Sequence, residues 1–340
     1  MIYLDNNSST PTDENIVKTM HVFYSENYGN PHSHTHMKGI NANLEIEKSR
    51  QKIANYFNAP KEGVVFTSGA TESNNLAITG YIKKAKKDGI NRKKVFCSAV
   101  EHKCVLECIQ NAKAYGLEAH ILKVDSQGKL DLDYAQECID EDTLLVSIMA
   151  TNNETGIDLQ IEEIGKICND NGVFFHSDIA QSLHHKLFDI ENSFIDIVSI
   201  SGHKIYGPKG VGALICKEEP ILNLEPLMLG GYQEAEIRSG TLPTNLCVGL
   251  GEAVDLLSKN KNTYYTHYKS LRDKLWNLLS KSIEDLQKNS LFIDHPGVLN
   301  LYFPNIDAEM LCIKLAKDVA ISTAAACNSS NYEYSYVLRE

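Results

Sequence analysis

Phe174-Phe175-His176-Ser177-Asp178 is an apolar run that ends on a carboxylate, and Ser201-Gly202-His203-Lys204 follows a second such run, residues 195–199. Short apolar runs bounded by polar residues and glycine are typical of buried strands. In open α/β sheets, ligands bind at the carboxyl ends of the strands, where the loops gather. The two stretches therefore predict strands with Asp178 and Lys204 at their functional ends.

Five further apolar runs share this character and alternate with segments of helical periodicity. They cover residues 63–67, 94–98, 119–124, 143–149 and 211–215. Alternation of strands and helices predicts a parallel sheet with helices on both faces. We therefore expect an α/β fold with a mostly parallel, seven-stranded sheet.

The pattern changes in the last quarter of the chain. From about Gly251 to Lys288 the sequence is typical of a long helix, and Val298 to Phe303 is typical of a strand. This change predicts a second, smaller α+β unit. We expect a large domain over residues 13–254 and a small domain formed by residues 1–12 and 255–340.

Composition argues against several classes of protein. The 340 residues are 43% apolar and 23% charged, which is ordinary for a soluble globular protein. The net charge of −11 argues against direct nucleic-acid binding, and no apolar run approaches the ~18 residues that cross a membrane. Residues 1–5 lack the basic and apolar regions of a signal peptide, so we expect a cytoplasmic protein.

Lys204 and Asp178 together indicate a cofactor. A lysine amine can hold a carbonyl cofactor as a Schiff base, and an ionised aspartate can keep a pyridine nitrogen protonated. A lone Lys is usually surface charge, and a lone Asp after a strand usually caps a helix. Lys204, however, sits in a turn rich in Gly and Pro between two strands, where functional loops are expected. The pair predicts a site for pyridoxal 5'-phosphate.

A phosphate site is predicted after the first strand of the sheet. Residues 66–75, Phe-Thr-Ser-Gly-Ala-Thr-Glu-Ser-Asn-Asn, place a turn at Gly69 and the Thr71 hydroxyl at a helix N-terminus, which suits a phosphate dianion. An ordinary capped helix explains this motif about as well. Ser201 and His203 could reach the same phosphate.

Three further side chains follow predicted strands and could contact the cofactor ring. Gln181 lies one helical turn after Asp178 and could bind the phenolic oxygen. His102 could stack on the ring and relay a proton, since imidazole titrates near neutrality. Asn153 could contact the ring oxygen or the substrate, although the Asn and Gly of residues 152–156 are also typical of a turn.

The nine cysteines form no metal or disulfide pattern, because they are spread along the chain without a CxxC pair. Cys327 lies among small residues in the stretch 322–330, which favours an accessible thiol. The stretch contains no Lys or Arg to stabilise a thiolate. From the residues alone, an incidental thiol is the better interpretation.

In this combination the residues resemble one family, the cysteine desulfurases of the NifS/IscS-like type, within the class V aminotransferases. The resemblance covers nearly the whole chain, and several long motifs in one order are far more specific than a short pattern. The matching segments are Tyr3-Leu4-Asp5-Asn6, Gly29-Asn30-Pro31, residues 67–75, Glu101-His102-Lys103, residues 146–156, 178–182 and 201–212, Arg238-Ser239-Gly240-Thr241-Leu242-Pro243, and Cys327 with Tyr336-Val337-Leu338-Arg339.

The resemblance implies the fold-type I architecture of pyridoxal phosphate enzymes and gives the residues roles. Lys204 would bind the cofactor covalently, and His102 would stack on the ring and transfer protons. The residues that would hold the phosphate are Ala70, Thr71, Ser201, Gly202 and His203, and those that would hold the ring are Asp178, Gln181 and Asn153. Thr241 would reach the phosphate of the partner in a homodimer.

The reaction implied by the resemblance converts L-cysteine to L-alanine. The sulfur would pass as a persulfide to Cys327, on a loop at about residues 320–332, and then to an acceptor protein. Iron–sulfur cluster assembly, tRNA thiolation and sulfur modification of DNA all begin with this step, and the sequence does not choose among them. No metal is implied.

Two departures from the family pattern leave alternatives open. Ala324-Ala325-Ala326 stands where the family often has Ser and Gly. The sequence ends at Glu340, and no residue matches the family's carboxylate-binding arginine, so we expect an incomplete small domain. One alternative is a scaffold that binds the cofactor without activity. The other is a selenocysteine lyase or aminotransferase that does not use Cys327.

Overall fold

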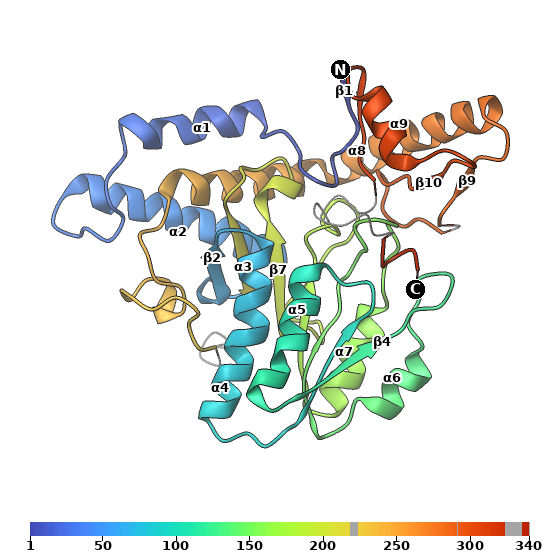
Figure 1. Cartoon of the computed structure of the whole chain (residues 1–340). Helices are drawn as coiled ribbons and strands as arrows, with labels where there is room; N and C mark the ends of the chain where they lie inside the picture. Colours follow the sequence, from blue (N-terminus) through green and yellow to red (C-terminus); the bar gives the residue numbers. More distant parts are fainter. Residues whose placement is uncertain (218–223, 291, 324–334, 340) are drawn as a thin grey trace.

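The structure of the chain, a computed structural model, describes residues 1–217, 224–290, 292–323 and 335–339 (Figure 1). A central sheet is covered by helices on both faces, and a smaller group of short strands lies beside one end of a long helix. The helices are α1 (Glu14–Ser25), α2 (Met37–Phe57), α3 (Ala70–Asn75), α4 (Tyr81–Lys87), α5 (Lys103–Asn111), α6 (Leu132–Cys138), α7 (Ile161–Asp170), α8 (Thr244–Ser282) and α9 (Ala308–Leu315). A π-helical turn, Leu76–Gly80, joins α3 to α4.

Seven strands form the main sheet in the order β2-β8-β7-β6-β5-β3-β4. Their bounds are β2 (Val64–Thr67), β3 (Lys94–Ser98), β4 (Glu118–Leu122), β5 (Thr143–Ser147), β6 (Phe174–Asp178), β7 (Ile197–Ser201) and β8 (Gly212–Cys216). The strands from β4 to β7 pair in parallel, and β8 is antiparallel to both of its neighbours. The predicted α/β fold with a mostly parallel, seven-stranded sheet is confirmed, and each predicted strand is present.

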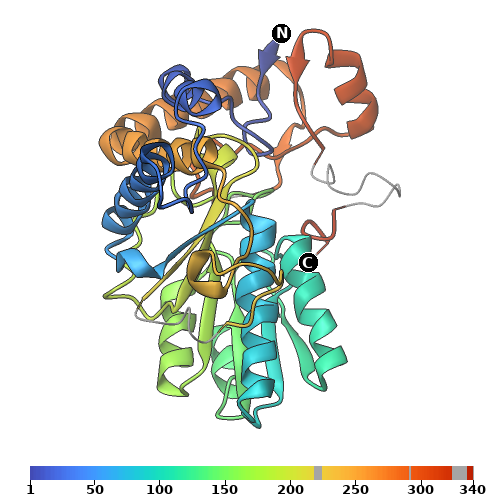
Figure 2. The ribbon, with the colours of Figure 1, turned by 90° about the vertical axis from the view of Figure 1, so that its left-hand side faces the viewer.

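The sheet has two apolar faces because neighbouring residues of a strand point to opposite sides. In β2, Val64 and Phe66 belong to one buried cluster, and Val65 belongs to the other. Figure 2 shows α7 on one side of the sheet and α3, α4 and α5 on the opposite side. Helices on both faces therefore bury the strands, which explains why they read as continuous apolar runs.

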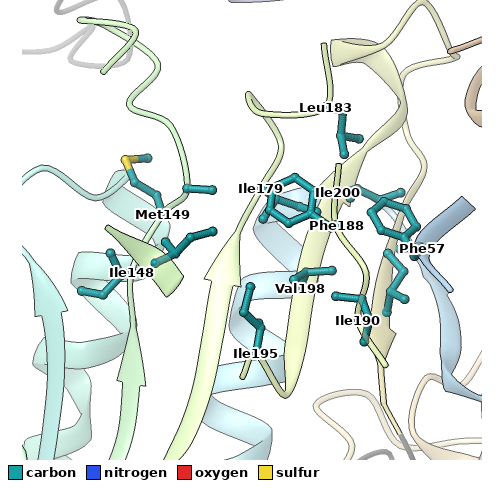
Figure 3. Packing of buried hydrophobic residues seen from close by; sticks show 14 of the residues in the cluster. Phe57, Ile148, Met149, Ile179, Leu183, Phe188, Ile190, Ile195, Val198 and Ile200 are labelled. Atoms are coloured by element: carbon teal, nitrogen blue, oxygen red, sulfur yellow. The ribbon is translucent and has the colours of Figure 1, made fainter. Parts of the chain in front are cut away.

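The buried cluster that contains Val64 and Phe66 lies between the sheet and the segments packed on that face, which include α2 and α7. Val198 and Ile200 of β7 lie close to Phe57 at the end of α2, and to Phe188 and Ile190 (Figure 3). Phe57, Ile190 and both β7 residues are completely buried. Burial of each such side chain stabilises the fold by about 1.5–3 kcal/mol.

The helix α8 connects the large and small parts of the molecule. It runs for 39 residues, and its buried residues lie in its first half, up to Leu257. The helix passes residues 254 and 255 without a break. The division into residues 13–254 and residues 1–12 with 255–340 therefore stays a prediction.

Among the described residues, no helix is both long enough and apolar enough to cross a membrane.

Short strands join the two ends of the chain in the smaller part. β1 (Ile2–Tyr3) pairs in parallel with β11 (Val319–Ala320), and β9 (Gln287–Lys288) pairs antiparallel with β10 (Leu301–Tyr302). The strand predicted at 298–303 is thus shorter than expected. Its first residue, Val298, is buried against the Gly156 turn and lies outside the strand pair.

Candidate active site

Apart from Thr241 and Cys327, the predicted site residues lie at one edge of the sheet, where the parallel strands end. His102 follows β3, Asn153 follows β5, Asp178 ends β6, and Lys204 follows β7. Because β8 is antiparallel, its first residue Gly212 lies at the same edge and pairs with Ser201. The topology therefore brings together side chains that are far apart in the sequence.

The glycine turn before α3 packs closely on this edge. Gly69 has a φ of 150°, which L side chains rarely adopt, and a Cβ atom on Gly212 would lie 2.7 Å from the Gly69 Cα. A Cβ atom on Gly69 would lie 3.8 Å from the Ser201 hydroxyl oxygen. The turn that carries Ala70 and the exposed Thr71 is thus placed against Ser201, as the phosphate prediction requires.

Asp178 is buried, and each of its carboxylate oxygens accepts a hydrogen bond. Oδ1 accepts from the Ala180 backbone N–H at 3.0 Å, and Oδ2 accepts from the Asn74 amide nitrogen Nδ2 at 2.7 Å. Asn74 belongs to α3 and is completely buried. Since a buried carboxylate is costly without donors, these two bonds hold Asp178 in one orientation.

His102 caps the N-terminus of α5 and contacts Cys104, two residues further along the chain. Its Nδ1 accepts the Cys104 backbone N–H at 3.2 Å, so the neutral ring carries its proton on Nε2. Burial lowers the pKa of His102, with nearby Asp178 opposing and Lys204 reinforcing that shift. The imidazole is therefore neutral at neutral pH.

The Cys104 thiol lies within this cluster of site residues. Its Sγ is 3.0 Å from His102 Nδ1 and 3.3 Å from Asn74 Nδ2. Burial raises the pKa of Cys104 to about 12, and the Asp178 charge adds to that effect. The thiol stays protonated at neutral pH, which makes it a poor nucleophile.

An N-terminal segment closes over Lys204. The Lys204 amine donates to the backbone carbonyls of Asn7 and Ser8, with 3.1 Å to Ser8. Gln181 Nε2 donates to the same Asn7 carbonyl at 3.0 Å, and Asn7 Nδ2 donates to the Asn153 carbonyl at 3.0 Å. Asn7 thus links Lys204, Gln181 and Asn153, three residues that the sequence predicted separately.

Two neutral histidines support the turn that carries Lys204. His203 Nδ1 lies 3.3 Å from the Ser9 hydroxyl, and burial together with the charges of Lys204 and Lys209 lowers its pKa to about 4. Burial also lowers the pKa of His184 to about 4, and its Nε2 donates to the Lys204 backbone carbonyl at 2.9 Å. Both rings hold this turn without adding positive charge beside the lysine.

Two predicted site residues, Thr241 and Cys327, involve a partner subunit or a segment outside the described residues. Thr241 is exposed, and its contact with a partner subunit stays a prediction. Arg238 of the same motif donates from Nε to Glu72 Oε1 at 2.9 Å, which ties this segment to α3. Cys327, with Ala324-Ala325-Ala326, lies outside the described residues.

Four residues at this edge were not predicted from the sequence: Asn7, Ser8, Asn74 and Cys104. A signal for Asn74 existed, because it lies three residues after Thr71 and so shares its helix face. No local signal could identify Asn7, because its contact with Lys204 joins residues 197 positions apart.

The groups at this edge fit pyridoxal phosphate. A lysine amine, an oriented buried carboxylate, a neutral imidazole and a glycine turn beside two hydroxyl groups match the aldehyde, the pyridine nitrogen, the ring face and the phosphate. Among the residues that the structure describes, no group of three or more His, Cys, Asp and Glu side chains is arranged to hold a metal ion.

Comparison with known proteins places the chain in a family. The model of the class V aminotransferases matches residues 2–339. The chain is 43% identical to the mitosomal cysteine desulfurase of Trachipleistophora hominis and to the mitochondrial cysteine desulfurase of Saccharomyces cerevisiae. Each alignment covers 99% of this chain, with 77% of the first relative and 67% of the second. The chain belongs to the cysteine desulfurases of the class V aminotransferases.

Solved structures agree with this assignment. A NifS-like protein superimposes with a TM-score of 0.90 at 33% identity, covering 99% of this chain and 88% of the other. The protein SspA, solved in complex with cysteine, superimposes with a TM-score of 0.87 at 32% identity, covering 100% of this chain and 94% of the other. The fold-type I architecture and the cysteine desulfurase activity are both confirmed, and neither alternative activity is favoured.

One sequence prediction is wrong. A cytoplasmic location was expected, but six relatives at 40–43% identity are named mitochondrial or mitosomal cysteine desulfurases. The expectation rested on two observations, that no apolar run is long enough to cross a membrane and that residues 1–5 lack the regions of a signal peptide. The folded part of an enzyme carries no physical record of the compartment in which it works, so this inference had no structural basis.

Proposed function

We propose that this desulfurase uses pyridoxal phosphate bound at the described edge of the sheet, and that Cys327 carries the sulfur removed from L-cysteine as a persulfide. The observation that supports the cofactor site best is the convergence of Lys204, Asp178 and His102 at the ends of three parallel strands of one sheet, β7, β6 and β3. When bound, the cofactor supplies an electron sink for bonds broken at the α-carbon of an amino acid.

Each residue has a distinct part in this proposal. Lys204 binds the aldehyde, and Asp178, oriented by Asn74, pairs with the pyridine nitrogen. Thr71, Ser201 and the backbone of the Gly69 turn take the phosphate, with Ala70, Gly202 and His203 beside them. Gln181 and Asn153 face the ring oxygen and the substrate.

His102 has the position and charge state of a proton carrier. Because Nδ1 is engaged by the Cys104 backbone N–H, the exchangeable proton sits on Nε2. Because its pKa is lowered, the imidazole is neutral at rest and can accept a proton from an acidic group of the bound substrate. These two features support the proposal that His102 moves protons at the substrate.

The sulfur transfer is balanced without an external oxidant or reductant. The Cys327 thiolate attacks the sulfur of the bound cysteine, and a sulfur–sulfur bond forms. The carbon–sulfur bond of the substrate breaks, its electron pair stays with the carbon, and that carbon takes up a proton to give L-alanine. The two sulfur atoms are oxidised as the carbon is reduced, which leaves Cys327 as a persulfide.

Two further parts of the proposal concern partners. We propose a homodimer in which Thr241, an exposed residue, reaches the partner's phosphate site. The acceptor is proposed to be an iron–sulfur scaffold protein in an organelle, which accords with the mitochondrial and mitosomal names of the relatives.

Incubation of the purified chain with pyridoxal phosphate and L-cysteine tests the cofactor assignment. We expect an absorbance band of the bound cofactor and formation of alanine, and we expect both to be lost in Lys204→Ala. If Lys204→Ala bound the cofactor and formed alanine as well as the wild type does, the assigned site would be contradicted. A Lys281→Ala variant, altered at the exposed end of α8, serves as the matched control.

A further inference from the structure

The segment that contains Cys327 is fastened to the active site at both of its described ends. On the preceding side, Ser322 Oγ donates to Asp5 Oδ1 at 2.7 Å. The same carboxylate oxygen accepts from Ser8 Oγ at 2.7 Å. Since the Ser8 carbonyl accepts from the Lys204 amine, this first attachment belongs to the N-terminal segment that closes the site.

Tyr336 makes the second attachment, on the other side of Cys327. Its hydroxyl donates to the backbone carbonyl of Glu101 at 2.5 Å. Glu101 directly precedes His102 and is completely buried, and its Oε1 accepts from the Ser98 hydroxyl at 2.6 Å and from the Met149 N–H at 2.7 Å. The acceptor for Tyr336 is therefore a rigid part of the His102 loop.

Ser335 makes the third attachment. Its Oγ donates to Glu154 Oε2 at 2.5 Å and accepts the Leu338 N–H at 3.3 Å. Ser335 and Val337 are each 6% exposed, so this short segment is packed into the molecule. Glu154 directly follows Asn153, so this attachment reaches the loop after β5, which lies beside the His102 loop.

These bonds have no role in holding the cofactor, since none involves a group assigned to it. Figure 2 shows the last described residues, near the label C, beside the helices that cover the sheet. The three attachments have a common feature, because they join the described residues on both sides of Cys327 to the His102 loop, the Asn153 loop and the N-terminal segment that contacts Lys204. When both ends of a segment are fixed near a site, a group on that segment has a higher effective concentration at the site.

We propose that Ser335 and Tyr336 are positioning residues for sulfur transfer. They act through Cys327, by fixing where the chain leaves the active site after that residue. The proposal rests on the proposed function, in which Cys327 accepts the substrate sulfur.

The test measures three quantities in the holoenzyme: the single-turnover rate of Cys327 persulfide formation by mass spectrometry, the dissociation constant of pyridoxal phosphate, and the KM for cysteine. In a variant combining Ser335→Ala with Tyr336→Phe we expect the persulfide rate to fall about tenfold or more, as the loss of two hydrogen bonds allows. The cofactor dissociation constant and the KM should change less than about twofold. Tyr302→Phe, an exposed tyrosine of β10, is the matched control.

A second pair of variants checks the Ser335 bond without altering Ser335. Glu154→Gln keeps an oxygen that accepts from Ser335 and should retain the wild-type rate, whereas Glu154→Leu should behave like Ser335→Ala. Glu154→Leu and Ser335→Ala remove the same hydrogen bond. Combining them should therefore lower the persulfide rate little further than either change alone.

Several results would overturn the proposal. A wild-type persulfide rate in the double variant contradicts it and leaves the proposed function intact. A parallel loss of cofactor affinity assigns the two residues a general structural role and also contradicts it. Absence of persulfide on Cys327 in the wild-type enzyme would remove the proposed function itself, and the positioning role with it.

Discussion

The side-chain amide of Asn74 donates a 2.7 Å hydrogen bond to Asp178 Oδ2. Asn74 is completely buried, and the same Nδ2 lies 3.3 Å from the Cys104 sulfur. One amide group thus connects the proposed partner of the pyridine nitrogen to the residue that fixes His102. The orientation of Asp178 depends on a helix residue as well as on its own strand.

Replacing Asn74 by Leu should weaken cofactor binding. The change removes a donor to a buried carboxylate, and a charge-assisted hydrogen bond contributes about 1.5–3 kcal/mol. We expect the dissociation constant of pyridoxal phosphate to rise about tenfold or more, measured by titration of the cofactor absorbance. Asn262→Leu on the exposed side of α8 is the control. An unchanged dissociation constant in Asn74→Leu would show that the Asn74 hydrogen bond to Asp178 does not contribute to cofactor binding.

Glu101 should make stability depend on pH. Burial raises the pKa of this carboxyl to about 8 from an ordinary value of 4.5, with the nearby Asp178 charge adding to it and the bonds from Ser98 and Met149 opposing it. The folded state then holds a proton that the unfolded state releases, so this stabilising contribution is full below pH 4.5 and declines as pH rises toward 8.

Urea denaturation between pH 5 and pH 8 measures this effect. The Glu101→Gln variant has nearly the same shape and no titrating proton, so its free energy of unfolding should fall less than that of the wild type over this range. Identical slopes for the two proteins would mean that Glu101 ionises normally despite its burial.

The ion pair between Arg50 and Glu234 should be important for stability. Arg50 Nη2 lies 2.6 Å from Glu234 Oε1, and both residues are 9% exposed. Arg50→Met leaves the Glu234 carboxylate buried without its partner, which costs about 3–5 kcal/mol. Chemical denaturation measures this cost. Lys48→Met breaks an exposed pair with Glu45 and should cost at most about 1 kcal/mol, so equal effects of the two variants would refute the argument.

The sequence was sufficient to predict the sheet, because its strands are covered on both faces. Apolar runs such as residues 143–149 and 211–215 carry no competing helical period, and β5 and β8 were found there. The long helix was predicted too late along the chain. α8 begins at Thr244, where small residues such as Gly249 and Gly251 pack against other segments and weaken the helical pattern.

The candidate site was predictable where its residues stand at strand ends in recognisable motifs. Lys204, Asp178 and His102 could be placed at one edge because parallel strands end together. Asn7 could not, since only the folded chain brings the N-terminal segment over Lys204. Cys104 was missed because buried thiols are usually small apolar residues, and its contact with His102 depends on the start of α5.

The most direct test of Cys327 as the sulfur carrier identifies which cysteine receives the sulfur. The full-length enzyme is incubated with L-cysteine and pyridoxal phosphate, digested, and analysed by mass spectrometry for persulfides. We predict one added sulfur on the peptide that contains Cys327, with none on the Cys104 peptide, and loss of the signal in Cys327→Ser but not in Cys104→Ser. A persulfide on Cys104, or alanine formation undiminished in Cys327→Ser, would contradict the claim.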